Sequence, residues 1–327
     1  MKKSAWIFCC LAVMGFSVST FKSWPPKHYT FLNGKADINK IWLGRVLFYD
    51  PILSRDSSIS CENCHSPYTA FTHTDHALSH GIEDRIGKRN APALFNLAWH
   101  NELMWDGAVN HLEVQALAPI TNADEMDESL PRLMLKLNRS AKYRSLFSRA
   151  FGDTVINTPR MLTAIAQFLL TLESRNSGYD SMKMGLKQFT QQEKRGYALF
   201  KKHCNSCHRE PLFSHFGFER NGLPPNVRLA DSGRMKITGS IKDLYRFKVP
   251  TLRNIELTYP YMHDGRFKNL SEVIRHYSDD IKIGTATEPL AGPLHLTSEQ
   301  KTDLMAFLLT LTDRSFILNN NHHFPKP

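Results

Sequence analysis

The pentapeptide "CENCH" at residues 61–65 recurs as "CNSCH" at residues 204–208, and this pair of motifs decides how the chain is organised. Each holds two cysteines followed directly by a histidine, and Cys-x-x-Cys-His is the attachment signature of c-type haem. Two thiols one helical turn apart reach the two vinyl groups of one porphyrin, and the adjacent histidine reaches the iron. The motifs therefore predict two covalently bound haem c groups, held by Cys61, Cys64 and His65 and by Cys204, Cys207 and His208.

Three other kinds of site also use cysteine pairs: a redox dithiol, a zinc site and two local disulfides. A redox dithiol normally occurs once, beside a strand–helix pattern. A zinc site would draw four ligands from both pairs, which leaves the histidine after each pair unexplained. The two motifs use every cysteine outside the first 21 residues, and this pattern favours haem.

Residues 1–21 have the pattern of a secretory signal peptide. Two lysines precede an apolar run over residues 5–18 that ends in small residues. The run is short for a membrane span, although an uncleaved anchor is the alternative. Cys9 and Cys10 would leave with the signal. We expect export, and a soluble remainder because no other long apolar run exists.

The chain is basic, with a formal net charge of +10 over 327 residues. Basic proteins often bind nucleic acid, but here no basic cluster is interleaved with aromatic residues, and export argues against that partner. A positive surface also suits the docking of an acidic redox protein.

The spacing of the motifs indicates two haem domains. They lie 143 positions apart, far beyond the period of small tandem repeats. We place the boundary near residues 172–185, with an N-terminal haem domain over residues 22–175 and a C-terminal haem domain over residues 176–327.

Helical signals surround both motifs. Apolar residues recur three and four positions apart over residues 158–174. Thr190 with Glu193, and Thr297 with Gln300, have the spacing of capping boxes that open helices. Strand alternation is scarce. The expected fold is mainly α, with two cytochrome c-like haem domains and long loops over the haem faces.

The second axial ligand of each iron decides function, because an open or removable ligand permits peroxide chemistry whereas two strong ligands favour electron transfer. The loop at residues 66–92 carries His73, His76 and His80. Each of these histidines is either a ligand that can move on and off the iron or an ordinary solvated loop residue.

The stretch "YMHDGRFKNLSEVIRHY", residues 261–277, offers candidates for the other iron. Asn269 and Glu272 have the spacing of a helix start. In the helix that follows, Tyr277 continues the apolar face formed by Leu270, Val273 and Ile274. Helical phase therefore turns Tyr277 inward and His276 outward. Periodicity alone leaves Tyr277 as either a core residue or a ligand.

Three segments give the chain a resemblance to the bacterial dihaem cytochrome c peroxidases and their relative MauG, which matures a tryptophan-derived quinone cofactor. They are "LGRVLFYDPILSRDSSISCENCH", "GKRNAPALFNLAWHNELMWDGAVNHLEVQALAPITNADEM" and "FKVPTLRNIELTYPYMHDGRF". The similarity covers roughly residues 40–315, with the motifs in family order.

The resemblance implies roles at the matching positions of the N-terminal domain. The haem on His65 would be the peroxidatic one, and His80 in "SHG" matches a removable distal histidine. Trp105 in "MWDG" matches a tryptophan between the haems that relays electrons. Gln115 and Glu125 match polar residues of the distal pocket where peroxide binds.

The resemblance also implies a calcium ion between the domains. Asn90, Thr258 and Pro260 match positions whose oxygen atoms bind it, and carbonyl and amide oxygens suit this hard cation.

The sequence departs from the usual peroxidase pattern at Tyr277. Typical peroxidases place a methionine ligand fourteen residues after the histidine of "HDG", and fourteen residues after His263 stands Tyr277, as in MauG-like members. A phenolate is a hard donor that favours Fe(III), whereas a thioether favours Fe(II). Met262 and Met305 remain possible thioether ligands away from the family position.

The resemblance implies a periplasmic peroxidase that reduces hydrogen peroxide to water. A small cytochrome or copper protein would supply the electrons, and related peroxidases suggest a homodimer. A MauG-like oxidase acting on a protein or small molecule through a high-valent haem state is the alternative. A third hypothesis, a dihaem electron carrier, predicts two permanently six-coordinate haems and no reaction with peroxide.

Overall fold

The computed structural model describes residues 24–31, 35–281 and 292–325. The expected signal peptide, residues 1–21, lies outside the described residues. The longer helices are α1 (Ile38–Tyr49), α4 (Leu130–Arg139), α5 (Ala141–Phe151), α6 (Thr158–Leu169), α8 (Gln191–His203) and α11 (Ser298–Leu309). The shorter helices are α2 (Cys61–Cys64), α3 (Leu117–Thr121), α7 (Gly178–Lys183), α9 (Met235–Thr238), α10 (Leu270–Arg275) and α12 (Arg314–Ile317). The mainly helical prediction is confirmed.

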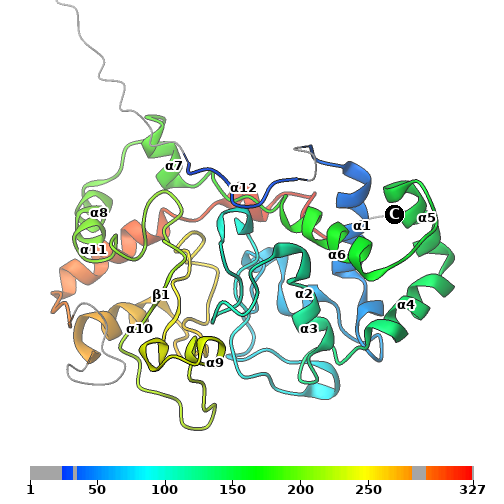
Figure 1. Ribbon diagram of the computed structural model, residues 1–327. Coiled ribbons are helices and arrows are strands. Elements are labelled where there is room, and N and C mark those ends of the chain that lie inside the picture. The colour runs from blue at the N-terminus through cyan, green and yellow to red at the C-terminus, as the bar shows by residue number, and fades with distance from the viewer. Residues whose placement is uncertain (1–23, 32–34, 282–291, 326–327) are drawn as a thin grey trace, which may run out of the picture.

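The helices form two lobes that lie side by side (Figure 1). One lobe contains α1, α4, α5 and α6, and the other contains α7, α8, α10 and α11. Each lobe has its own hydrophobic core. Phe48, Phe71 and Phe168 meet in the first core, and Phe200, Phe213 and Phe307 meet in the second.

Each lobe is built on one close helix crossing at a glycine. A Cβ atom on Gly44 of α1 would lie 1.9 Å from the Ala164 carbonyl oxygen of α6, and one on Gly196 of α8 would lie 1.9 Å from the Asp303 carbonyl oxygen of α11. Since no side chain fits at either contact, glycine lets the helix backbones touch.

Local capping explains where the helices begin. The Thr190 hydroxyl accepts from the Glu193 backbone N–H at the start of α8, and Thr297 does the same with Gln300 at the start of α11. Both predicted capping boxes are confirmed. The predicted helix over residues 158–174 is also present, although α6 ends at Leu169.

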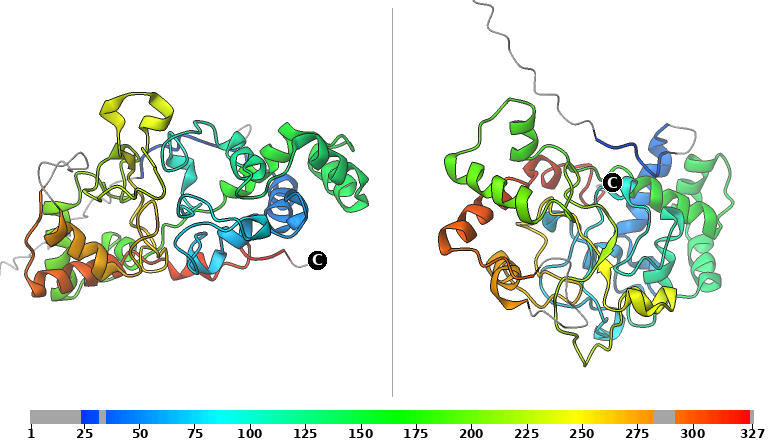
Figure 2. Two further views of the ribbon diagram at one scale, coloured as in Figure 1. Left: turned by 90° about the horizontal axis from the view of Figure 1, so that it is seen from below. Right: turned by 60° about the vertical axis from the view of Figure 1, so that its left-hand side comes forward.

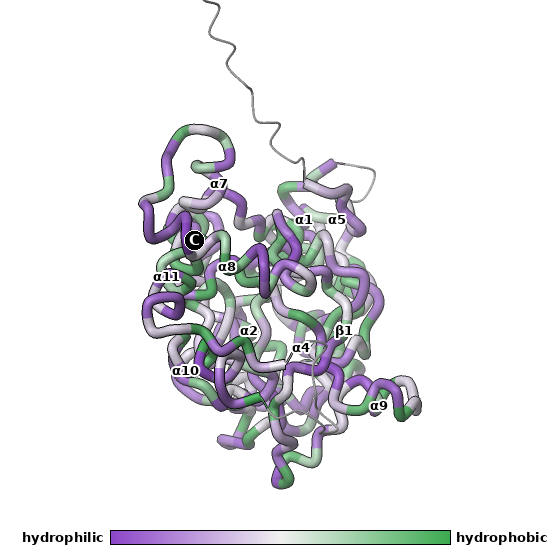
Figure 3. Tube along the Cα trace, turned by 90° about the vertical axis from the view of Figure 1, so that its left-hand side faces the viewer, coloured by the Kyte–Doolittle hydropathy of each residue, from purple (hydrophilic) through white to green (hydrophobic). Residues whose placement is uncertain are grey.

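Strand structure is minimal, as expected. β1 (Phe218–Glu219) and β2 (Phe247–Lys248) pair antiparallel as the described chain's two-stranded sheet. Between them, the segment that carries α9 stands out from the body of the molecule (Figure 2). Hydrophilic and hydrophobic residues alternate along this segment (Figure 3).

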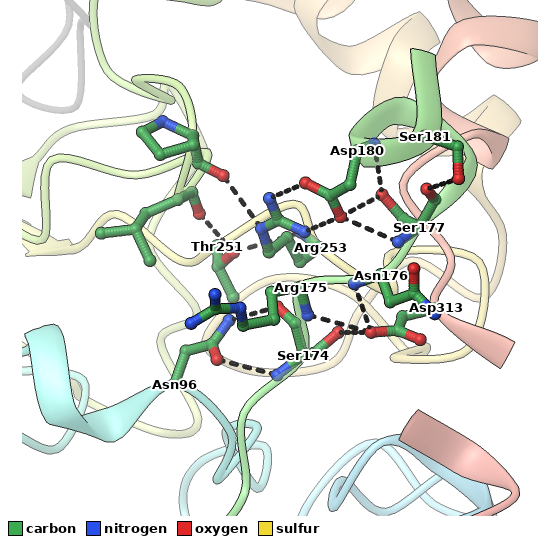
Figure 4. Close-up of polar contacts among 12 residues, drawn as sticks. Asn96, Ser174, Arg175, Asn176, Ser177, Asp180, Ser181, Thr251, Arg253 and Asp313 are labelled. Carbon is green, nitrogen blue, oxygen red and sulfur yellow. Dashed lines mark hydrogen bonds and ion pairs between the residues drawn. The ribbon is translucent and has the colours of Figure 1, made fainter. Parts of the chain in front are cut away.

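A buried polar network holds the linker between the lobes (Figure 4). The Asn96 side chain exchanges two hydrogen bonds with the backbone of Ser174. One carboxylate oxygen of Asp313 accepts from the backbone N–H groups of Arg175 and Asn176 at 2.9 and 2.8 Å. The linker is thereby fixed to both neighbouring lobes. The domain division at residues 175 and 176 stays a prediction.

The end of the chain packs on the first lobe. Phe316 and Ile317 of α12 belong to its core, and Tyr49 donates to the His322 carbonyl oxygen at 2.5 Å. Residues 313–325 thus cross from the second lobe to the first (Figure 1). Within the described residues, no helix has the length and apolar character needed to span a bilayer.

Candidate functional site: two haem motifs and two cavities

The first motif forms the single turn α2, directly after Ser60. His65 follows it, and the backbone N–H of His65 donates to the carbonyl oxygens of Cys61 and Glu62. Its Nδ1 lies 2.9 Å from the Phe71 carbonyl oxygen. A histidine that donates Nδ1–H to a carbonyl is held with Nε2 free as a lone-pair donor, which is the usual arrangement of a metal-binding histidine.

The second motif follows the end of α8 in tight turns. The backbone N–H groups of Cys207 and His208 both donate to the Cys204 carbonyl oxygen. His208 Nδ1 lies 3.2 Å from the Phe213 carbonyl oxygen and 3.1 Å from that of Pro250. The two motifs thus present their histidines in the same way, although only the first is helical.

The electrostatic environment of both histidines favours the neutral form. Burial lowers the pKa of His65 to about 4 and that of His208 to about 4, despite the backbone carbonyls that oppose the shift. A neutral imidazole is the form that binds iron.

The four cysteines are free thiols rather than disulfides, so the disulfide alternative is wrong. Burial raises the pKa of Cys61 to about 12 and that of Cys204 to about 12. No group of three or more His, Cys, Asp or Glu side chains in the described part of the chain has the geometry of a metal site. The zinc alternative therefore has no support, and the residues fit covalent haem.

The second cavity lies directly at its motif. Cys204, Cys207 and His208 line it, opposite apolar residues of α10 and α11. Tyr277 lines it too, and burial followed by the charges of Cys204 and Cys207 raises the pKa of the phenol. The phenol thus lies close to the two thiols that would hold the haem.

His276 is placed differently from the prediction. It is buried, with 2% of its surface exposed, and its Nε2 lies 2.7 Å from the Asn221 carbonyl oxygen. The predicted outward orientation of His276 is therefore wrong. The reason is that α10 ends at Arg275 and continues as a π-helical turn, His276–Asp280, which changes the helical phase and lets His276 and Tyr277 both face inward.

The other residues singled out in the sequence near Tyr277 differ in whether they line a cavity. Asn269 caps α10 as predicted, by accepting from the Glu272 backbone N–H. Met262 lines both cavities, whereas Met305 packs against the second core and is absent from the cavity lining. His263 lines the second cavity and stacks on Phe247, with ring centroids 3.6 Å apart.

The first cavity contains several of the predicted site residues. Trp105, Gln115 and Asn90 line it together with Thr258 and Pro260. Gln115 is buried, and its Oε1 has no hydrogen-bond partner in the described part of the chain. Because a buried amide oxygen without a partner is costly, this group is available to a ligand of the cavity.

Asn90 has the donor pattern that an oxygen-binding cation requires. Its Nδ2 donates to the Ala77 carbonyl oxygen at 3.0 Å, which directs the amide so that Oδ1 remains for another partner. Asn90, Thr258 and Pro260 share one cavity wall. Calcium binding there stays a prediction.

Glu125 and His80 lie outside the lining of both cavities. Glu125 Oε1 accepts from Asn122 at 2.8 Å, and burial raises the pKa of this carboxyl. Its charge acts on Cys61 and Cys64, which places it beside the first motif.

His80 is half-buried in its loop. Its Nδ1 lies 3.2 Å from Asp84 Oδ1, and its ring stacks on that of His76 at 4.1 Å. The His76 ring stacks in turn on His73. The three loop histidines therefore contact one another rather than standing as isolated solvated residues.

Trp105 joins the two cavities, because it lines both. Its Nε1 donates to the Asn90 carbonyl oxygen at 2.8 Å, and its own carbonyl oxygen accepts from the Lys248 backbone at 2.8 Å. The indole is thereby fixed between the cavity at the second haem motif and the first cavity, whose lining does not include Cys61, Cys64 or His65.

Sequence reasoning missed two buried bases in this region. Lys248 lines both cavities with 8% of its surface exposed, and its ammonium group donates to the Glu102 carbonyl oxygen. His100 lines the first cavity with an unpartnered Nε2. The position of Lys248 between Phe247 and Val249, both apolar, was the available signal for burial.

Comparison with known proteins supports this geometry. Residues 38–188 match the family model described as di-haem cytochrome c peroxidase, and residues 193–312 match that of cytochrome c. Methylamine utilization protein MauG of Methylophilus methylotrophus is 35% identical over 86% of this chain and 84% of that protein. Cytochrome c551 peroxidase of Nitrosomonas europaea is 36% identical over 83% and 79%.

Solved structures give the same result. A MauG-like protein associated with microbial copper homeostasis superposes with a TM-score of 0.81 at 32% identity, covering 93% of this chain and 97% of that one. The diheme peroxidase BthA of Burkholderia thailandensis, with a TM-score of 0.74 at 24% identity over 86% and 88%, shares the fold.

Proposed function

This chain belongs to the family of di-haem cytochrome c peroxidases and MauG proteins, and from that premise we propose that it reduces hydrogen peroxide to two waters with electrons from a small redox protein. Trp105 carries the proposal, because its indole lines both the cavity at the second haem motif and the first cavity, which Gln115 also lines. Two electrons and two protons are required for each peroxide. The two haems supply the redox chemistry, and the protein supplies the electron path and the protons.

Cys204, Cys207 and His208 would hold the haem that takes up electrons, and Trp105 would relay them toward the N-terminal domain. The indole is anchored by its bond to Asn90. The shared walls of the cavities keep the path short, which supports transfer within one chain.

Two side chains handle peroxide at the N-terminal haem on His65. Glu125 accepts the proton from one peroxide oxygen and donates it to the other, as a general acid and base. Its raised pKa suits both roles. Gln115 orients the ligand with its free amide oxygen. His80 would serve as a removable ligand of the haem held by His65.

Calcium bound by Asn90, Thr258 and Pro260 would stiffen the region between the cavities, since these residues come from both lobes. We place the enzyme in the periplasm, and a homodimer is its proposed assembly.

Replacing Glu125 by Gln tests the catalytic role. Loss of acid–base catalysis costs about 10²–10⁴-fold in rate, so peroxide turnover should fall by that factor while both haems stay bound. The neighbouring Asp124→Asn is the matched control and should turn over like the wild type. Equal turnover in all three proteins would remove Glu125 from the mechanism.

Tyr277 favours a second candidate, a MauG-like oxidase. As a ligand of the C-terminal haem, its phenolate would stabilise Fe(III), which would disfavour a role in electron entry. Peroxide added without a reductant separates the two functions. An oxidase would oxidise an added protein or small molecule, whereas the peroxidase consumes peroxide only as fast as its donor supplies electrons.

A further inference from the structure

The positive charge of the chain is concentrated around the second haem motif. Residues 191–250 contain twelve Lys and Arg but only five Asp and Glu, so this stretch has a formal charge of +7 out of +10 for the whole chain. The other 267 residues together have a charge of only +3. The excess is therefore concentrated in one segment of the sequence.

Several of these cations lie at the second cavity or beside its motif. Ser206 and Arg220 both line this cavity, and Lys202 and Arg209 are exposed beside its motif. Arg209 Nε donates to the Ser206 carbonyl oxygen at 3.2 Å. Its acceptor is a carbonyl, and no carboxylate of the described residues forms a salt bridge with this guanidinium.

The projecting α9 segment extends the same surface. Arg220 donates to the carbonyl oxygens of Leu244 and Lys242 at 3.0 and 3.2 Å, which attaches the segment to the cavity rim. Lys236 and Lys242 are exposed on it. The segment stands clear of the body in two further views of the molecule (Figures 2 and 3).

Exposed apolar side chains accompany these lysines. Val227 is 88% exposed and Ile241 is 67% exposed. A few apolar contacts framed by charges of one sign are typical of short-lived redox complexes, which bury small areas and depend on electrostatic steering.

We propose that this basic face docks the acidic face of a small redox protein, the electron donor to the C-terminal haem. We define the basic face as Lys202, Arg209, Arg220, Lys236 and Lys242, together with Val227 and Ile241. The inference rests on the proposed function only in treating the partner as a donor. Opposite charges raise association rates by 10–10³-fold, which a single pair of surface charges cannot do.

Charge reversal on the face tests the proposal. The variant combines Lys202→Glu, Lys236→Glu and Lys242→Glu, three exposed lysines that do not line a cavity. The control combines Lys35→Glu, Arg139→Glu and Arg149→Glu on the other lobe, where the three cations are also exposed. Both variants change the net charge equally.

The readout is the second-order rate of haem reduction by reduced flavodoxin, an acidic small redox protein, in a stopped-flow instrument without peroxide. At about 0.01 M ionic strength, where charges act over about 30 Å, the face variant should be reduced at least tenfold more slowly than the control. At about 1 M salt, where charges act over about 3 Å, the two rates should converge.

Equal rates for the face variant and the control at low salt would overturn the proposal, because net charge alone would then explain steering. The rate of haem reduction by dithionite should be the same in the wild type, the face variant and the control. Peroxide turnover with a small uncharged reductant tests the proposed function separately, so loss of that activity with steering intact contradicts the peroxidase and not the docking face.

Discussion

Tyr277 is the side chain on which the chemistry of the second haem depends. It lines the cavity beside Cys204 and Cys207, and burial raises the pKa of its phenol. A buried phenol keeps its proton unless a positive charge stabilises the phenolate, and ferric iron on the neutral side chain of His208 is such a charge. We therefore propose Tyr277 as a ligand of the C-terminal haem.

Replacing Tyr277 by Phe should change the C-terminal haem and leave the N-terminal haem unaltered. Loss of the anionic ligand favours Fe(II), so the reduction potential of the C-terminal haem should rise. Met262→Leu is the matched control, because Met262 lines the same cavity and carries the competing thioether. Optical and electron paramagnetic resonance spectra of the oxidised proteins give the readout. A spectrum altered by Met262→Leu and not by Tyr277→Phe would assign the thioether instead.

For single residues, the inward orientation predicted for the Tyr277 side chain was correct. The outward orientation predicted for the His276 side chain was wrong. The heptad-like spacing from Leu270 to Tyr277 assumes 3.6 residues per turn throughout. The π-helical turn breaks that assumption at His276, and no residue type in this stretch signals such a turn. The burial of Lys248 was equally unpredictable from periodicity, because its strand β2 is only two residues long.

At the scale of elements, the two helix crossings at glycine position the haem motifs. α1 precedes the first motif and packs on α6, and α8 precedes the second and packs on α11. The backbones touch at Gly44 and at Gly196, so each motif starts from a fixed helix pair.

Gly44→Ala should destabilise the first lobe. The new Cβ would overlap the Ala164 carbonyl oxygen, and overpacking a tight contact costs about 1–3 kcal/mol. Ser145→Ala on the exposed face of α5 is the control and should not lower stability, because alanine is a better helix former. Urea unfolding followed by circular dichroism measures both. Wild-type stability in Gly44→Ala would contradict the close crossing.

Elements were predictable where local chemistry determines them. Thr190 and Thr297 open helices because hydroxyl caps act within four residues. The end of α6 at Leu169 rather than near residue 174 was not predictable, because Ser174 and its neighbours are drawn into the linker by the distant Asn96 and Asp313. Such long-range partners leave no local signal.

At the scale of the whole molecule, the buried network around the linker sets how the two haem-binding lobes sit. Arg253 and Asp180 form a bidentate pair with both distances at 2.8 Å, and both side chains are almost fully buried. Arg253 also donates to the Pro211 carbonyl oxygen and lines the first cavity. The pair thus connects α7, the loop after His208 and the neighbouring lobe.

Asp180→Asn should lower the free energy of unfolding by about 3–5 kcal/mol, because it leaves Arg253 buried without its counter-charge. The control is Glu256→Gln, which removes the half-exposed partner of Arg314 and should cost about 0–1 kcal/mol. Urea unfolding gives both values. Similar losses in the two variants would show that the buried pair does not stabilise the assembly of the lobes.

The two-lobe plan followed from the repeated motif, but the path of the C-terminus did not. Residues 313–325 return to the first lobe, where Tyr49 and Arg45 bind their backbone. Because every residue offers a backbone carbonyl, the sequence does not indicate which residues accept these bonds. The return of the C-terminal segment to the first lobe was therefore not predictable.

The central claim is that hydrogen peroxide is reduced by two electrons, one held by each haem. Anaerobic titration with hydrogen peroxide tests this claim most directly. The protein is first reduced fully with dithionite, which gives two electrons per chain, and the excess is removed. One equivalent of peroxide should then reoxidise both haems together, and Glu125→Gln should slow this step about 10²–10⁴-fold. Haems that stay reduced, or that are destroyed before both are reoxidised, would contradict the account.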